Sequence, residues 1–522
     1  MTELIETDVL IIGCGVAGCT AALQLAEAGL LVTMVTRAQV PSESNTYYAQ
    51  GGIIYQGKGD SPELLSEDIM RAGAGHCNPK AVAILAEECP KAVKEILLEK
   101  AKVPFDRTPE GELSLVREGG HSIPRILHRA DTTGQSIETA LVTTLSPYPN
   151  VTLLTAHTAV DLLTPSHHSL NRLSVYEPRS CVGAYLLNQA EGQVIRCLAK
   201  KTLLATGGLG QIFLQTTNPP GSRGDGIAMA NRAGDQIINA EFIQFHPTTL
   251  YHTQAPRFLI SEAVRGAGAR LVHANGEPFM QHYAPEWKDL APRDIVARSI
   301  HQEILKRDVS NVYLDLRAYI PDQQIMEHFP NIYETCLTYG IDITRQLVPV
   351  VPAAHYSCGG VWVDEWGQTT IRQLYAIGEV ACTGIHGANR LASTSLLEGV
   401  VWGRRAAQHI LQTITAQPAY NPAHIPPWHD DSYETPDPAL ISQDMSNIKH
   451  IMWNYVGLVR TSHRLNRAIR ELRNLENEIE RFYRVTRLTD SLIGLRNAVR
   501  TAVIVTFAAW ENKTSIGCHY RE

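Results

Sequence analysis

The feature that most constrains the fold of this chain is a set of glycines that directly follows a short apolar run near the N-terminus. Residues 8–12 read Asp-Val-Leu-Ile-Ile, as expected of a strand buried on both faces, and residues 13–18 read Gly-Cys-Gly-Val-Ala-Gly. The pattern predicts a helix over residues 19–28, ended by Gly29, and a second strand over residues 30–36. A strand, a G-x-G-x-x-G turn, a helix and a strand in this order form a βαβ unit that binds a dinucleotide.

Each glycine of this turn has a role in the backbone geometry. Gly13 permits the tight turn, Gly15 lets a pyrophosphate approach the main chain, and Gly18 lets the helix pack closely on the strand. The fingerprint usually carries an acid at the end of the second strand, but Thr36 and Arg37 stand there, which weakens a plain NAD interpretation. A helix merely packed on a sheet is the alternative. We expect these residues to contact the cofactor: Gly13, Cys14, Gly15, Val16, Ala17, Gly18 and Arg37.

The composition of the 522 residues excludes several other classes of protein. Lys and Arg total 46 against 53 Asp and Glu, a net charge of −7, so no nucleic-acid partner is expected. The ten Cys contain no C-x-x-C pair, which argues against a metal site or a disulfide framework and favours a reducing compartment. The first ten residues are acidic, unlike a signal peptide, and glycines interrupt the apolar stretch 9–26. We therefore expect a cytoplasmic protein without a membrane span.

Two later segments identify the dinucleotide. Residues 201–208 and residues 374–379 are apolar runs that lead into Gly-Gly and Gly-Glu, respectively. Together with the N-terminal turn they resemble the FAD-binding fold, in which distant strands return to one sheet and the acid, here Glu379, reaches the ribityl chain. Ser393 and Ser395 precede an apolar segment and predict a capped helix. Its N-terminus would face the flavin pyrimidine, although an ordinary capped helix is the alternative.

Segments across almost the whole chain resemble the succinate dehydrogenase/fumarate reductase flavoprotein family. Their number and their common order make the resemblance specific. They include residues 47–52 (Tyr-Tyr-Ala-Gln-Gly-Gly), 118–122 (Glu-Gly-Gly-His-Ser), 241–249 (Glu-Phe-Ile-Gln-Phe-His-Pro-Thr-Thr), 260–266 (Ile-Ser-Glu-Ala-Val-Arg-Gly), 290–298 (Leu-Ala-Pro-Arg-Asp-Ile-Val-Ala-Arg), 351–356 (Val-Pro-Ala-Ala-His-Tyr) and 386–392 (His-Gly-Ala-Asn-Arg-Leu-Ala).

The resemblance implies three parts. An α/β, Rossmann-like FAD-binding domain would comprise residues 1–240 and 348–415, and an α+β capping domain would be inserted at residues 241–347. A helical domain at residues 416–522 would follow, beginning with a Pro-rich linker. The active site of the family lies between the FAD-binding domain and the cap.

The resemblance also implies that FAD is bound noncovalently. Family members of membrane complexes carry a His near position 45 that bonds covalently to the flavin, whereas this chain has Asn45. A lower flavin potential would then favour oxygen or fumarate as the electron acceptor. Besides the glycine turn and Arg37, the expected contacts to FAD are Asn45, Thr46, Tyr47, Tyr48, Ala49, Gln50, Gly51, Gly52, Asp225, Glu379, Ser395 and Leu396.

A four-carbon dicarboxylate requires cationic or donor groups at both ends, and arginine suits a carboxylate best. By resemblance, Arg293 transfers a proton beside the β-carbon of the substrate, and Glu262 with Arg265 connects it to solvent. Free guanidinium stays protonated, so this role depends on the resemblance alone. The carboxylate clamp would consist of His246, Ser261, His355 and Arg390.

Glu118 indicates which dicarboxylate is bound. Members that act on succinate or fumarate are expected to have an aromatic residue here, whereas members that act on L-aspartate have a carboxylate that pairs with the α-ammonium group. A solvated loop acid next to Arg117 is the alternative. The implied reaction is oxidation of L-aspartate to iminoaspartate by hydride transfer to flavin N5, the first step of NAD biosynthesis. Reoxidation by O2 would give H2O2, reoxidation by fumarate would give succinate, and quinolinate synthase would be a partner that consumes the product.

Two other functions remain open on the sequence alone. A soluble fumarate reductase would share every proposed site residue except Glu118. A flavin-binding protein without turnover is the other, because the chain departs from the family pattern at Ala267, Pro278, Thr394 and the tail 512–522.

Overall fold

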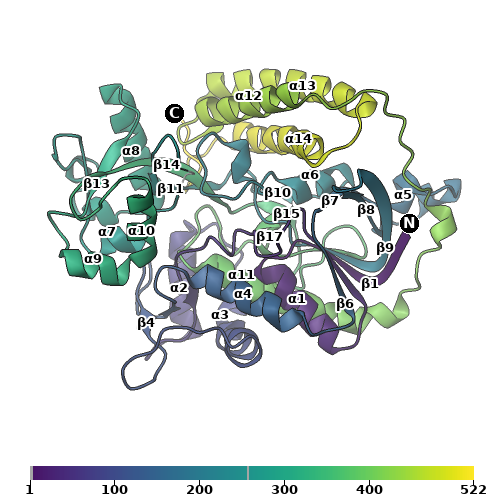
Figure 1. Cartoon of the computed structure of the whole chain (residues 1–522), viewed down its shortest axis with the longest axis horizontal. Coiled ribbons are helices and arrows are strands. Elements are labelled where there is room, and N and C mark those ends of the chain that lie inside the picture. Colours follow the sequence, from purple (N-terminus) through teal and green to yellow (C-terminus); the bar gives the residue numbers. More distant parts are fainter. Residues whose placement is uncertain (1–3, 256–257) are drawn as a thin grey trace.

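The computed structural model describes residues 4–255 and 258–522. In Figure 1 the main sheet and its helices lie on the right and below, a smaller sheet with its own helices lies on the left, and three long helices lie along the top. This arrangement matches the expected α/β domain, inserted α+β segment and helical C-terminal part.

The main sheet collects strands from distant parts of the chain. It has seven strands in the order β6-β2-β1-β9-β8-β7, with β16 also paired to β9. β9 pairs in parallel with β1 on one side, while its other side pairs first with antiparallel β8 and then with parallel β16. The strands are β1 (Leu4–Ile12), β2 (Val32–Val35), β6 (Val151–Leu154), β7 (His157–Leu162), β8 (Gly183–Asn188), β9 (Gln193–Leu204) and β16 (Leu374–Ala376).

The N-terminal βαβ unit is confirmed, with shifted boundaries. α1 (Val16–Glu27) begins three residues earlier than predicted, directly after Gly15, and β2 is shorter than the predicted strand. α1 shares a hydrophobic core with α3 (Pro79–Val93), α4 (Thr133–Leu145) and α11 (Thr394–Thr413). Shorter elements complete this part: α2 (Pro62–Ala72), α5 (Pro165–His168), the sheet of β3 (Ile53–Ile54), β5 (Ile126–Leu127) and β4 (Leu115–Val116), and the sheet of β10 (Ile237–Ile238), β15 (Gly360–Trp362) and β17 (Ala381–Cys382).

The inserted segment has its own sheet and core. The sheet order is β11-β14-β13-β12, from β11 (Ile243–Leu250), β14 (Val348–Ser357), β13 (Val312–Asp315) and β12 (Arg270–Val272). β14 begins where we expect the FAD-binding domain to resume, yet it pairs with both β11 and β13, so the segment that leaves the cap also completes its sheet. The helices are α7 (Glu262–Gly266), α8 (Arg293–Arg307), α9 (Asp322–His328) and α10 (Pro330–Thr338).

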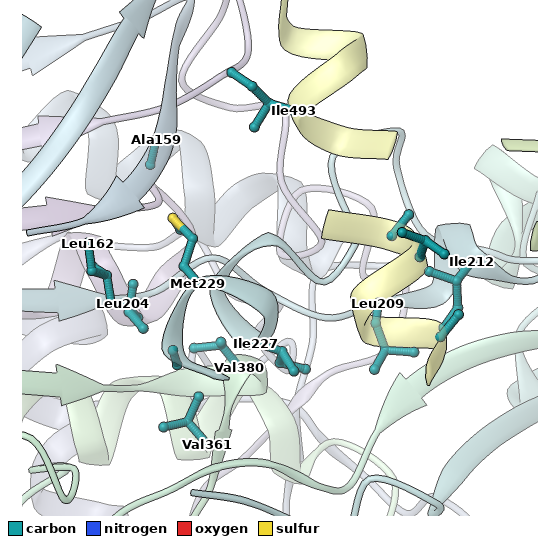
Figure 2. Close-up of a cluster of buried hydrophobic side chains, with 14 of the residues drawn as sticks. Ala159, Leu162, Leu204, Leu209, Ile212, Ile227, Met229, Val361, Val380 and Ile493 are labelled. Atoms are coloured by element: carbon teal, nitrogen blue, oxygen red, sulfur yellow. The ribbon is translucent and has the colours of Figure 1, made fainter. Parts of the chain in front are cut away.

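The C-terminal helices share a core with the main sheet. They are α12 (Pro438–Val456), α13 (Ser462–Val485) and α14 (Asp490–Glu511). Among the described residues, α14 alone is long and apolar enough to cross a membrane, but most of it is buried inside the protein. Figure 2 shows Ile493 of α14 in one cluster with Ala159 of β7 and Met229 of α6 (Asp225–Arg232). Hydrophobic contact therefore fixes α14 against the sheet.

Gly13 provides a test of this architecture. Its φ is +118°, and a Cβ at this position would lie 2.1 Å from the carbonyl oxygen of Ala205, in the backbone that follows β9. Backbone strain and overpacking each cost about 1–3 kcal/mol, so Gly13→Ala should lower the free energy of unfolding by roughly 3 kcal/mol or more. Urea unfolding of the FAD-free protein measures this loss.

Gly29→Ala is the matched control for this variant. Gly29 also has a positive φ, +82°, but nothing lies within 4 Å of the place that a Cβ would occupy, so only the left-handed penalty of about 1–2 kcal/mol applies. Equal losses in the two variants would show that the contact between the two turns does not matter.

Candidate active site

One cavity of about 660 Å³ holds most of the predicted cofactor and substrate residues. It lies at the carboxyl ends of β1, β2, β9 and β16 and extends to the inserted segment, which is where α/β sheets bind ligands. Its wall includes these predicted cofactor residues: Gly13, Cys14, Gly15, Val16, Ala17, Arg37, Asn45, Thr46, Tyr48, Ala49, Gln50, Gly51, Gly52, Asp225, Glu379, Ser395 and Leu396. It also includes Glu118, His246, Ser261, Glu262, Arg293, His355 and Arg390.

Three predicted residues are not part of the wall. A Cβ at Gly18 would lie 2.2 Å from the carbonyl oxygen of Gly13, so this glycine lets α1 pack on the turn. The Tyr47 hydroxyl accepts a hydrogen bond from Gln135 Nε2 at 2.9 Å. Arg265 is almost fully buried behind the wall.

The dinucleotide end of the cavity contains polar groups that lack partners. Gly15 provides no side-chain cap for α1, and the first turn contains no acid. The Val16 N–H donates to Thr46 Oγ1 at 3.1 Å, whereas the N–H groups of Ala17 and Gly18 remain for an anion, as far as the described residues show. Among the described residues, Thr206 Oγ1 and Gln50 Oε1 are buried in the wall without a hydrogen-bond partner. Unpaired buried polar atoms are rare and costly, and FAD carries phosphates and hydroxyl groups that can pair with them. The residues present therefore fit FAD.

Glu379 and Asn45 form a hydrogen-bonded pair in the middle of the wall. Asn45 Nδ2 donates to Glu379 Oε2 at 2.7 Å, and the Ser222 hydroxyl donates to Asn45 Oδ1 at 3.2 Å. The backbone N–H of Ser357 donates to Glu379 Oε1 at 3.0 Å. Burial raises the pKa of Glu379 to about 7.

Two neutral histidines lie side by side on the cap side of the cavity. The rings of His246 and His355 are 5.3 Å apart. Burial lowers the pKa of both rings well below the usual value, and nearby arginine charges add to this effect. His246 Nδ1 bonds to the backbone of Thr248, and His355 Nδ1 bonds to the Thr217 hydroxyl at 2.9 Å. Each Nε2 is therefore left for a ligand, as far as the described residues show.

Arg293, the first residue of α8, is held on two sides. Its Nε donates to Glu262 Oε2 at 2.6 Å, and one terminal nitrogen donates to Gln244 Oε1 at 3.4 Å. Gln244 is oriented in turn, because its Nε2 donates at 2.8 Å to Asn389 Oδ1 and to the Arg390 carbonyl. The guanidinium of Arg293 thus has a fixed orientation in the wall.

Glu262 remains ionised despite its surroundings. Burial opposes ionisation, but the charges of Arg293 and Arg265 outweigh it and lower the pKa of Glu262. Arg265 lies three residues later on α7 and donates to the Asp289 carbonyl, and burial lowers its pKa. No hydrogen bond joins Glu262 to Arg265 within the described residues, so only the first two members of the predicted relay are in direct contact.

Arg390 rests on an aromatic ring. Its guanidinium lies 4.6 Å from the ring centre of Tyr356, and one terminal nitrogen donates to the Ser395 hydroxyl at 3.0 Å. The Tyr356 hydroxyl donates to buried Glu398 at 2.9 Å and lies 3.0 Å from His386 Nε2. Tyr356 and Gln244 were not predicted as site residues, although both lie inside motifs that carry the family resemblance.

Glu118 points into the cavity rather than into solvent beside Arg117. Its Oε1 accepts from the Gly52 N–H at 3.3 Å, and its Oε2 accepts from the Ser393 hydroxyl at 2.5 Å. A Cβ at Gly119 would lie 2.2 Å from Glu262 Oε1, so the loop that carries Glu118 touches the ion pair of Glu262. Its carboxylate and the arginines therefore share one wall.

The predicted cap of α11 is wrong in one respect. α11 does begin at Thr394, but Ser393 has a φ of 59° and its hydroxyl bonds to Glu118 instead of capping the helix. The N-terminus of α11 therefore opens uncapped on the cavity at Ser395 and Leu396. The unusual residues Ala267, Pro278 and Thr394 do not line the cavity.

The fold and the cavity define a flavin-dependent oxidoreductase, since the glycine turn, the strand ends and the arginines of the cavity wall match that class. Consistent with this, the family model described as "FAD binding domain" matches residues 8–396, and the one described as "Fumarate reductase flavoprotein C-term" matches residues 445–522.

Curated relatives and solved structures identify the family. The chain is 44% identical to L-aspartate oxidase of Pseudomonas aeruginosa, over 100% of this chain and 96% of that protein. It is 41% identical to a chloroplastic L-aspartate oxidase of Oryza sativa subsp. japonica, over 99% and 81%. An E. coli quinol fumarate reductase superposes with a TM-score of 0.89 at 28% identity, over 100% and 92%. The chain belongs to the L-aspartate oxidase family, within the succinate dehydrogenase/fumarate reductase flavoproteins.

The raised pKa of Glu379 predicts a pH-dependent stability. The ordinary pKa of a glutamate is 4.5, and that of Glu379 in the folded FAD-free protein is about 7. Between these two pH values Glu379 keeps a proton in the folded protein that it has already released in the unfolded chain. The stabilising contribution of Glu379 is therefore present at low pH and is lost as the pH rises through about 7. Glu379→Gln should remove this dependence, so urea midpoints of variant and wild type should diverge between pH 5 and pH 8. A constant difference would contradict the assignment.

Proposed function

We propose that this protein oxidises L-aspartate to iminoaspartate, with FAD as the cofactor that accepts the hydride. The reaction would be the first step of NAD biosynthesis. The observation that carries the proposal is the position of Glu118, whose carboxylate lies in the same cavity wall as Arg293 and Arg390.

The two substrate carboxylates bind to arginines and neutral histidines. Arg390 is fixed over Tyr356 and presents its remaining donors to the cavity, which suits a carboxylate. His246 and His355 can each donate from Nε2 when Nδ1 accepts its threonine hydrogen bond. Ser261 caps α7 in the same wall: its hydroxyl accepts from the Ala263 N–H at 3.3 Å and can still donate to a carboxylate. Binding at both ends holds the substrate in one orientation.

Glu118 binds the group that distinguishes L-aspartate from fumarate. An ammonium group has three donors, and an ionised carboxylate accepts them with a strong charge-assisted hydrogen bond. The Ser393 hydroxyl and the Gly52 N–H hold the carboxylate of Glu118 in place. The α-carbon is thereby oriented for loss of its hydrogen.

Arg293 handles the proton of the fumarate reaction. Its Nε is fixed by the ionised carboxylate of Glu262, and Gln244 orients its other arm. Exchange of this proton with solvent would pass through Glu262 and Arg265. We assign these roles on the family motifs, with the Arg293–Glu262 contact as support.

The remaining assignments concern electrons, products and location. L-Aspartate loses two electrons and two protons, which O2 takes up to give H2O2 or fumarate takes up to give succinate. FAD is bound noncovalently, since Asn45 replaces the His of covalent relatives and is held by Glu379. Quinolinate synthase is the proposed consumer of iminoaspartate. We place the reaction in the cytoplasm, while plant relatives are named chloroplastic.

Anaerobic mixing with L-aspartate tests the proposed function. The flavin absorbance of the purified holoenzyme should bleach with L-aspartate and recover when fumarate is added. Vigorous fumarate reduction without bleaching by L-aspartate would instead identify a soluble fumarate reductase, which the solved neighbours resemble in fold. Flavin that responds to neither compound would identify a binding protein without turnover.

Glu118→Gln tests recognition of the ammonium group. A hydrogen bond to a charged group contributes about 1.5–3 kcal/mol, so the KM for L-aspartate should rise roughly 10-fold to 100-fold. The KM for fumarate, which carries no ammonium group, should stay within about two-fold and serves as the internal control. Steady-state assays with both substrates decide the matter, and equal effects on both would remove Glu118 from substrate recognition.

Arg293→Leu tests proton transfer. General acid catalysis contributes about 100-fold to 10,000-fold, so kcat for fumarate reduction should fall by at least about 100-fold. The flavin content should stay the same, because Arg293 lies on the cap side of the cavity, away from the glycine turn. Activity within ten-fold of wild type, at full flavin content, would refute the role of Arg293.

A further inference from the structure

A carboxylate from the C-terminal helices bonds to a cofactor residue of the N-terminal βαβ unit. Arg37 follows β2 and lines the cavity at the position where this fold holds the adenosine ribose. Its Nε donates to Asp490 Oδ1 at 3.4 Å, and a terminal nitrogen donates to Asp490 Oδ2 at 3.2 Å. Asp490 is the first residue of α14 and lies 453 residues away in the chain.

The same carboxylate connects to two further parts of the cavity wall. The Thr158 hydroxyl donates to Asp490 Oδ1 at 2.8 Å, and Thr158 itself lines the cavity. Buried Arg223 donates to both oxygens of Asp490 at 3.1 Å and to Asp225 Oδ2 at 2.8 Å. Asp490 thus bonds directly to two wall residues, Arg37 and Thr158. Through Arg223 it is also connected to a third, Asp225.

The contacts leave little freedom to Arg37. Two of its three nitrogens face Asp490, and the third lies 3.8 Å from Glu43 Oε1, another wall residue. Burial favours the neutral form of Asp490, but Arg223 and Arg37 outweigh it and lower the pKa of Asp490 to about 2. The carboxylate is therefore ionised at neutral pH and holds the planar guanidinium in one orientation.

We propose that Asp490 is a positioning residue for the adenosine half of FAD. It acts through Arg37 and Thr158, so α14 must be docked on the sheet for tight cofactor binding. The proposal rests on FAD as the cofactor but not on the identity of the substrate. By linkage, FAD must stabilise the docked state of α14 to the same extent that docking tightens FAD binding. If the contact merely stabilised the fold, its loss would instead weaken the binding of every ligand of the cavity equally.

Asp490→Asn separates the two cases when the apoprotein is titrated with FAD, ADP and FMN. ADP occupies the adenosine half of the site and FMN the flavin half. The Kd values for FAD and ADP should rise at least ten-fold, measured by flavin fluorescence and calorimetry, and the Kd for FMN should stay within two-fold. Equal losses for all three ligands, or no loss for any, would overturn the proposal.

Glu480→Gln is the matched control. Glu480 on α13 accepts a hydrogen bond from Arg496 of α14 at 2.7 Å, so it too pairs a C-terminal acid with an arginine, but neither residue lines the cavity. Its three Kd values should match those of the wild type. If Glu480→Gln also weakens FAD and ADP selectively, Asp490 has no special role.

Arg37→Gln tests whether Asp490 acts through Arg37. In the Arg37→Gln background, Asp490→Asn should raise the Kd for FAD by less than three-fold, because the contact to Arg37 is already lost and only the contact to Thr158 remains to be changed. Fully additive losses would contradict the mechanism. If Asp490→Asn does not yield folded protein, Arg37→Lys tests the same contact, since it keeps the charge but loses the two-pronged hydrogen bond, and it should weaken FAD and ADP but not FMN. Failure of wild-type apoprotein to bind FAD would overturn the cofactor assignment itself.

Discussion

The pairing of β9 with both β1 and β16 is the constraint on which the rest of the molecule depends. It brings strand ends from residues 12, 204 and 376 to one edge of the sheet. Gly13 lies directly against the carbonyl of Ala205, so the turns after β1 and β9 form one continuous floor. The N-termini of α1 and α11 both open onto this part of the cavity wall. A cofactor with phosphates at one end and an electron-accepting ring at the other therefore finds positive helix ends along its length.

Charge balance explains why the cap wall suits an amino dicarboxylate. Arg293 and Arg390 each place a positive charge in the wall, and Arg265, buried behind it, balances the negative charge of Glu262. Two positive charges remain, which matches the two carboxylates of the proposed substrate. The histidines add no charge, because burial and the arginines keep them neutral. In the proposed function, Glu118 supplies the further negative charge that pairs with the ammonium group.

The sequence predicts best what depends on neighbouring residues. The βαβ unit follows from glycine spacing and strand patterns, which are short-range signals, whereas most of the predicted cavity wall follows from the motifs that carry the family resemblance. Tertiary contacts account for the differences. Ser393 has the local pattern of a helix cap, but Glu118, 275 residues away, takes its hydroxyl. The hydrogen bond between Arg37 and Asp490 spans 453 residues, and no local pattern marks Asp490 as a cavity partner. Gln244 lies inside one of the family motifs and could have been predicted as a site residue. Its contact to Arg293 depends on how the inserted segment packs on the sheet.

The position of α11 in the chain determines when the cofactor site can assemble during synthesis. α1 is complete at residue 27, but α11, which covers it, begins at residue 394. At roughly 5–20 residues per second, a ribosome needs about 20 to 70 seconds to make the intervening chain. The face of α1 that packs on α11 has no partner helix during that interval, although α3 and α4, which share its core, are already made. The wall of the cofactor site, which includes Ser395 and Leu396, is therefore complete only after α11 has been made.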